Sequence, residues 1–108
     1  MKIFKDSCVD KYLNNISKEE HARIIKTINL FSDYGFKLST KYLKKLSYEV
    51  WELRAGKQRV SFGLVKGNII IVNIFYKKTQ KTPKREVDVA INRLKNCLWK
   101  NQRIQYYF

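Results

Sequence analysis

The stretch that decides the fold is EVWELRAGKQRVSFGLVKGNIIIVNIFY, from Glu49 to Tyr76. Hydrophobic and polar residues alternate through most of it, which is typical of strands with one buried face, and it ends in a β-branched run. Two turn signals, at Gly56 and Gly67, divide it into three segments. We predict an antiparallel meander with strands at Tyr48–Arg54, Gln58–Val65 and Ile69–Tyr76.

Helices are predicted on both sides of this meander in the sequence. Ser17-Lys18-Glu19-Glu20 has the pattern of a capping box, and apolar residues follow it at helical spacing as far as Tyr34. Gly35 is a typical C-terminal stop. Thr82-Pro83 has the order of an N-cap followed by the first helical residue, so a second helix is predicted from Pro83 to about Leu98.

The remaining segments carry weaker patterns. Met1–Phe4 is expected to be a short strand or an extended start, and Thr40–Leu46 a short turn of helix or a connector. The pattern of Trp99–Phe108 does not settle its state. Because no repeat or linker interrupts the chain, residues 1–108 are predicted to form a single domain. The predicted class is α+β, with N-terminal helices and a C-terminal helix packed on one face of a small twisted antiparallel sheet.

The composition points to an anionic partner. The 108 residues include 23 Lys and Arg against 9 Asp and Glu, which gives a formal net charge of +14. A domain this basic is attracted to nucleic acid, the ribosome, an anionic membrane or an acidic protein, and charge alone does not choose among them. No apolar run approaches bilayer length and no signal-peptide stretch opens the chain. We therefore expect a cytoplasmic protein without a membrane partner.

Strand alternation assigns part of this charge to one face of the predicted sheet. The parity expected beneath the helices is apolar: Trp51, Leu53, Val60, Phe62, Leu64, Ile70, Val72 and Ile74. The opposite, uncovered parity carries Glu52, Arg54, Arg59, Ser61, Asn73, Phe75 and Lys77. Arginine forks hold phosphate oxygens, lysines add mobile charge and an aromatic ring stacks on a base, so this face is a candidate site for a phosphate chain. The alternative is an ordinary solvated charged face.

Three motifs stand out in this region: LSYEVWELR from Leu46 to Arg54, QRVSF from Gln58 to Phe62, and FYKKTQKTP from Phe75 to Pro83. The last precedes a predicted helix with Glu86, Ala90 and Arg93. Together they resemble the RelE/ParE superfamily of type II toxins, in particular its phage-derived HigB-like branch. The resemblance extends from about Tyr42 to Leu98. It implies N-terminal helices on a twisted antiparallel sheet, which the periodicity predicts independently.

The resemblance also implies a function. HigB-like and RelE-like members cut mRNA while it is translated on the ribosome, and a HigA-like antitoxin with a helix-turn-helix holds such a toxin inactive. Operator DNA is then an indirect partner, reached through the antitoxin. ParE-like members of the same fold inhibit DNA gyrase and cut no RNA, so a gyrase-directed toxin is the alternative. A plain RNA- or DNA-binding module is a third interpretation, supported by charge alone.

Cleavage of RNA in this family implies attack by the 2′-OH without a metal, and no cluster of Asp, Glu and His suggests a metal or another cofactor here. Arg59 matches a strand arginine that contacts the scissile phosphate. Lys77 and Lys78 match a catalytic basic pair, so one of them is interpreted as the leaving-group acid or a phosphate clamp. A neutral lysine acting as base is also conceivable. Glu52 is interpreted either as the base or as an ion-pair partner of Arg54 or Arg59.

The other candidates are predicted to bind RNA. Arg54 matches the Leu-Arg of the family strand and either binds RNA or pairs with Glu52. Phe75 and Tyr76 are candidates for stacking on a base, although one of the two is expected in the core. Val50 and Glu52 stand where RelE-like toxins carry lysines, which leaves the identity of the acid and the base open. The predicted contacts with ribosomal RNA are Lys41, Lys44, Lys45, Lys81, Lys84 and Arg85.

Overall fold

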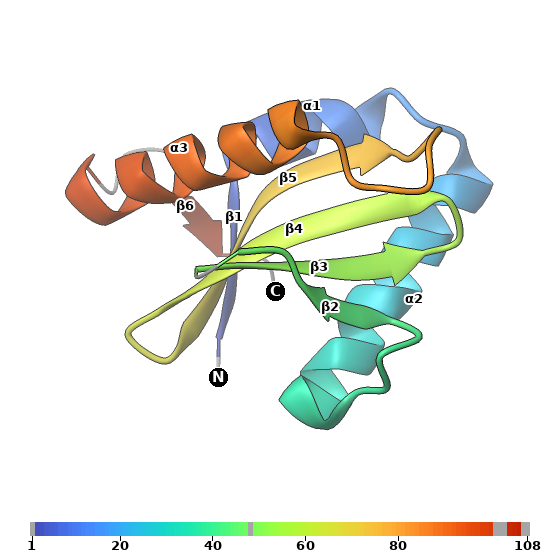
Figure 1. Cartoon of the computed structure of the whole chain (residues 1–108), viewed down its shortest axis with the longest axis horizontal. Helices are drawn as coiled ribbons and strands as arrows, with labels where there is room; N and C mark the ends of the chain where they lie inside the picture. Colours follow the sequence, from blue (N-terminus) through green and yellow to red (C-terminus); the bar gives the residue numbers. More distant parts are fainter. Residues whose placement is uncertain (1, 48, 101–103, 107–108) are drawn as a thin grey trace.

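The computed structural model describes residues 2–47, 49–100 and 104–106, with side chains described as far as residue 96. It contains three α-helices and a sheet with the strand order β2-β3-β4-β5-β1-β6 (Figure 1). The α+β class is therefore confirmed. In chain order the elements are β1 (Ile3–Asp6), α1 (Ser7–Asn14), α2 (Lys18–Tyr34), the 3-10 turn η1 (Gly35–Lys37), β2 (Leu43–Lys45), β3 (Val50–Ala55), β4 (Gln58–Val65), β5 (Asn68–Tyr76), α3 (Lys84–Lys100) and β6 (Ile104–Tyr106).

The predicted meander is confirmed, because β3, β4 and β5 pair antiparallel in sequence order. Its second hairpin has positive φ at both loop residues, 51° at Lys66 and 79° at Gly67, which is the pattern of a type I′ turn. The sheet as a whole is mixed rather than antiparallel, because β1 pairs in parallel with β5. A segment predicted as a turn of helix or a connector forms the short edge strand β2, which pairs with β3.

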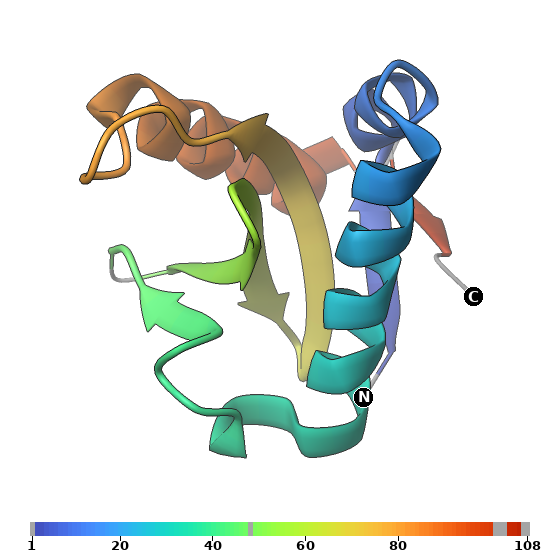
Figure 2. The ribbon, with the colours of Figure 1, turned by 90° about the vertical axis from the view of Figure 1, so that its right-hand side faces the viewer.

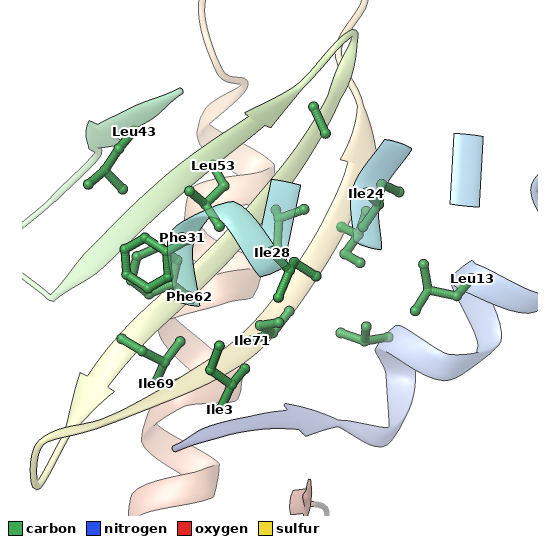
Figure 3. Packing of buried hydrophobic residues seen from close by; sticks show 14 residues of the cluster. Ile3, Leu13, Ile24, Ile28, Phe31, Leu43, Leu53, Phe62, Ile69 and Ile71 are labelled. Carbon is green, nitrogen blue, oxygen red and sulfur yellow. The ribbon is translucent and has the colours of Figure 1, made fainter. Parts of the chain in front are cut away.

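The helices cover both faces of the sheet, whereas the sequence predicted one. Helices α1 and α2 pack over the larger core, and α3 lies across the opposite face (Figure 2). In the larger core, Phe31 of α2 packs against Phe62 of β4, with ring centroids 4.9 Å apart and planes at 47° (Figure 3). The smaller core places Ala90 and Leu94 of α3 against the sheet.

A β-bulge between β4 and β5 explains why parity misplaced part of the core. Ser61 pairs with Asn73 but Phe62 pairs with Ile71, so the pairing passes over Val72. An extra residue reverses the parity of everything beyond it. Ile70 and Val72 consequently face α3 rather than α2. Leu64 was also predicted to be buried and is 50% exposed.

The ends of the helices show which local signals were decisive. Ser17 caps α2 by accepting a hydrogen bond from the Glu20 backbone N–H at 3.1 Å, as predicted. The eight-residue α1 was not located from the sequence; Asp6 caps it by accepting a hydrogen bond from the Cys8 backbone N–H. Helix α3 begins at Lys84, so Pro83 rather than Thr82 directly precedes it, and the Thr82 hydroxyl donates to Glu52 Oε2. In the described part of the chain, every helix is too short or too polar to cross a bilayer.

A glycine in β4 allows α3 to lie close to the sheet. A Cβ at Gly63 would be 2.5 Å from Leu94 Cδ2, and Leu94 is buried. We expect Gly63→Ala to destabilise the protein by about 1–3 kcal/mol through overpacking. Urea unfolding of Gly63→Ala, Leu94→Ala and the double variant would measure this. The double variant should lose less than the sum of the single losses, and full additivity would show that the two side chains do not collide.

Candidate phosphate-binding site

A basic hollow of ≈ 590 Å³ lies where β3 ends, β4 begins and β5 ends. In Figure 1 this is the end of the sheet beneath the loop that leads into α3. Arg54 and Arg59 are directly opposite each other in the β3–β4 pairing. The Lys77 backbone N–H donates to Lys57 O at 2.8 Å, which brings the residue after β5 to the same place. The lining residues are Arg54, Lys57, Arg59, Tyr76, Lys77, Lys78, Thr79 and Gln80.

Arg54 and Arg59 both lie close to the buried carboxylate of Glu52. Glu52 is 0% exposed. Its Oε1 lies 3.7 Å from Arg59 Nε and 3.9 Å from Arg54 Nε. At these distances the contacts are ion pairs and not hydrogen bonds. Glu52 Oε1 and the Nε atoms of both arginines have no hydrogen-bond partner among the described residues. One buried negative charge thus faces two positive charges, and the cluster keeps a net positive charge toward the hollow.

The other oxygen of Glu52 holds the loop between β5 and α3. The Thr82 hydroxyl donates to Glu52 Oε2 at 2.6 Å. Within the same loop, the Thr79 hydroxyl donates to Lys81 O at 2.8 Å. The hydrogen bond from Thr82 fastens the segment that carries Lys77 and Lys78 to the middle of β3. Sequence reasoning interpreted Thr82 as a helix cap and missed this role, because the partner lies 30 residues away.

Arg59 is held in place by the turn that precedes it. Its Nη1 donates to Gly56 O at 2.6 Å and to Gln58 O at 3.0 Å. Burial lowers the pKa of Arg59, with Glu52 opposing and Arg54 adding to that shift. An arginine remains charged after any such shift. In this conformation Nη2 is the group of Arg59 that is left to bind a phosphate oxygen.

Lys77 lies in a strongly cationic environment. Its pKa is lowered by partial burial and then by the charge of Arg59, with Arg54 and Lys44 acting in the same direction and Glu52 opposing them. A lowered pKa means that a larger fraction of this amine is neutral at a given pH than for an ordinary lysine. Lys77 is thus a candidate both for holding an anion and for accepting a proton.

The pKa of Lys77 gives a direct test of this geometry. We expect Arg59→Met to raise it, because a cation that disfavours the charged amine is removed. An NMR titration of the lysine Cε–Hε signals would measure the shift. The matched control is Lys66→Met, which removes the same charge from the hairpin turn at the opposite end of β4 and β5 and should leave Lys77 unchanged. An unchanged or lower pKa in Arg59→Met would contradict the arrangement.

Two other predicted features are corrected by the structure. The predicted polar face is not uncovered, because α3 and the loop before it bury Glu52, Ser61 and Asn73. Phe75 was a candidate for stacking on a base, but it is only 8% exposed and is part of the interior. Tyr76 is 46% exposed and lines the hollow, so it is the aromatic residue available there.

The predicted RNA-binding cations divide into three groups. Arg54 lines the hollow together with the catalytic candidates Arg59, Lys77 and Lys78. Lys44 and Lys45 lie exposed on the edge strand β2, beside the hollow rather than in it. The remaining four are also exposed: Lys41 lies in the turn before β2, and Lys81, Lys84 and Arg85 lie on the loop before α3 and on its first turn.

The chemistry of the hollow is that of an anion site. Within the described residues, no three His, Cys, Asp or Glu side chains gather where they would hold a metal ion. The charges that converge are guanidinium and ammonium groups, which bind phosphate oxygens and stabilise negative charge that develops on them.

Comparison with protein families gives a match over most of the chain. Residues 11–95 match the family model described as "Phage derived protein Gp49-like (DUF891)". The matched residues include β2 to β5, the loop with Thr82 and most of α3, and therefore the whole hollow. No curated protein matches the chain.

Proposed function

Because this chain belongs to the phage-derived Gp49-like family, which is a family of RelE-like toxins, we propose that it is the HigB-like toxin of a type II toxin–antitoxin system and cleaves translated mRNA. Its partners in this proposal are the ribosome with its mRNA and a HigA-like helix-turn-helix antitoxin, which brings the complex to operator DNA. The observation that carries the nuclease proposal is the convergence of Arg54, Arg59, Lys77 and Lys78 on one hollow.

The proposed reaction is transfer of the phosphate from the 5′-oxygen to the neighbouring 2′-oxygen. Neutral Lys77 accepts the proton of the 2′-OH, and the 2′-oxygen forms a bond to phosphorus. Arg59 stabilises the charge that develops on the phosphate oxygens. The bond from phosphorus to the 5′-oxygen breaks, and Lys78 donates a proton to that oxygen. The products are a 2′,3′-cyclic phosphate and a 5′-OH.

Glu52 has a different role in this proposal from that of a base. Its carboxylate is buried, one oxygen accepts the Thr82 hydroxyl and the other faces Arg54 and Arg59. It therefore positions the groups that touch RNA. This supports the ion-pair interpretation of Glu52 over its use as the general base.

Ribosome dependence is expected because the protein supplies only part of what the reaction needs. The hollow is open and carries cations, with no His among its lining residues in the described structure. Holding the substrate near its reactive geometry supplies a large part of many catalysed rates. We propose that the ribosome holds the mRNA in this way, so that free RNA is cut weakly.

Induction of the protein in a bacterium, followed by primer extension on cellular mRNA, tests the proposal. Cuts within translated codons are expected. DNA breaks linked to gyrase, with intact mRNA, would instead support the ParE-like alternative. Equal cleavage of naked RNA and translated mRNA would contradict ribosome dependence. A neighbouring gene that encodes a small helix-turn-helix protein would further support the antitoxin partner.

Thr82 offers a test of how the basic loop is held. Thr82→Val keeps the shape of the side chain but leaves Glu52 Oε2 buried without its donor, which should cost about 1–3 kcal/mol of stability. We expect cleavage to slow mainly through kcat, because Lys77 and Lys78 lose their fixed position. Thr82→Ser, which keeps the hydroxyl, should restore both properties. If Thr82→Ser is as impaired as Thr82→Val, the hydrogen bond is not what positions the loop.

A further inference from the structure

A second depression of ≈ 420 Å³ borders the basic hollow. Arg54 lines both. Its walls come from η1, β2 and β3, and they combine aromatic rings with cations. None of its lining residues that the structure describes is acidic. The aromatic and basic residues that line this depression are Phe36, Trp51, Lys44, Lys45 and Arg54.

The aromatic part of this second depression, called the groove from here on, is the exposed ring of Phe36, which neighbouring rings hold in place. Phe36 is 41% exposed. It packs edge-on against Trp51, with ring centroids 4.9 Å apart and planes at 63°, and edge-on against Phe31 at 5.4 Å and 87°. A ring fixed in this way offers a flat apolar surface without the entropic cost of ordering it on binding. Such a surface stacks on a base of any identity.

The cationic part adjoins the ring on one side and the hollow on the other. Lys44 and Lys45 are exposed on β2, and Lys45 Nζ lies 5.4 Å from the centre of the Trp51 ring. Lys44 is directly opposite Glu52 in the β2–β3 pairing. Its charge also contributes to lowering the pKa of Lys77, so the two depressions share one positive field.

We propose that this groove is a subsite for single-stranded RNA that binds the nucleotide next to the scissile phosphate. The base lies against Phe36 and Trp51, and its phosphate is held between Lys44 and Arg54. This inference rests on the proposed function and extends it to a second nucleotide. A groove with cations alone would suit any polyanion, but a fixed aromatic face beside the cations matches the alternation of base and phosphate in a nucleotide chain.

Binding of uncleavable RNA tests the subsite without any need for activity. The probe is a 2′-O-methylated trinucleotide with 2-aminopurine at one position, whose fluorescence falls when that base stacks. Stacking on an aromatic side chain is worth about 1–3 kcal/mol, which corresponds to a factor of roughly 5 to 150 in Kd. We expect Phe36→Ala to weaken binding by a factor in this range and to remove the quenching. Phe36→Leu, which preserves apolar packing, should do the same.

The controls separate this inference from the proposed function. Tyr34→Ala, at a residue that is 60% exposed but outside the groove, should bind the trinucleotide normally. The inference is overturned if Phe36→Leu binds like the unchanged protein or if Tyr34→Ala is equally weakened. If the subsite is overturned in this way but the protein still cuts mRNA, the proposed function is kept without the subsite. Preference of the groove for an acidic peptide over the trinucleotide would also overturn it and would identify a protein partner.

Discussion

Replacing Arg59 with Met should lower the rate of mRNA cleavage by about 10²–10³-fold, because that is the usual cost of removing one preorganised donor to a developing oxyanion. The position of Arg59 in the hollow is fixed by hydrogen bonds from its Nη1 to the backbone of its own turn, at Gly56 O and Gln58 O. Single-turnover cleavage on programmed ribosomes is the direct measurement. Growth after induction gives the cellular counterpart.

Two comparisons make the Arg59 result interpretable. Arg59→Lys keeps a charge but loses the planar fork, so it should recover only part of the rate. Lys66→Met removes one positive charge from the far end of the same hairpin and should cleave normally. The antitoxin should still bind Arg59→Met, which would show that the fold is intact. Full toxicity of Arg59→Met would refute the proposed site.

The largest expected loss of stability comes from Glu52→Ala. This change leaves Arg54 and Arg59 opposite each other without the carboxylate between them and removes the acceptor of the Thr82 hydroxyl. Removing one partner of a buried ion pair typically costs about 3–5 kcal/mol. Urea unfolding of the unchanged protein, Glu52→Gln and Glu52→Ala would measure the loss. Glu52→Gln should lose less, because its amide oxygen can still accept from Thr82.

A control and a salt series identify the cause of that loss. Glu49→Ala removes an exposed acid from just before β3 and should change stability by no more than about 0.5 kcal/mol. If repulsion between the arginines is a main part of the cost, raising the ionic strength should narrow the gap between Glu52→Ala and the unchanged protein. A loss for Glu52→Ala no larger than that for Glu49→Ala would mean that the buried carboxylate does not support the hollow.

The parts of the fold that the sequence predicted are those fixed by local rules. The meander follows from period-two alternation and from the turn at Lys66-Gly67, and α2 follows from its capping box and Gly35. The sequence missed that α3 covers the second face of the sheet. The reason is that one bulged residue, Val72, reverses which face the side chains of the first half of β5 point to. A bulge depends on pairing between strands, which alternation along one strand does not reveal.

In the candidate site, too, the features set by local patterns were predictable and those set by tertiary contacts were not. Alternation brought Arg54, Arg59 and Lys77 together, because their spacing along β3, β4 and β5 places them on one face at one end of the sheet. The burial of Phe75 and the hydrogen bond from Thr82 to Glu52 were not predictable, because both depend on how the loop before α3 folds over the sheet. The groove at Phe36 depends on the position of η1 beside β3, which again is a tertiary contact.

The parallel pairing of β1 with β5 has a consequence for synthesis of the protein. The strand β1, Ile3–Asp6, pairs with residues 69–71 of β5 on one side and with residues 104–106 of β6 on the other, both far along the chain. The Glu52 carboxylate beneath the hollow is buried later still, when Thr82 and α3 pack over it. Contacts this distant in sequence form slowly and late. A nascent chain that has emerged as far as β4 therefore has neither a complete sheet nor a closed hollow, and the hollow is complete only after β5 and the loop with Thr82 have been made.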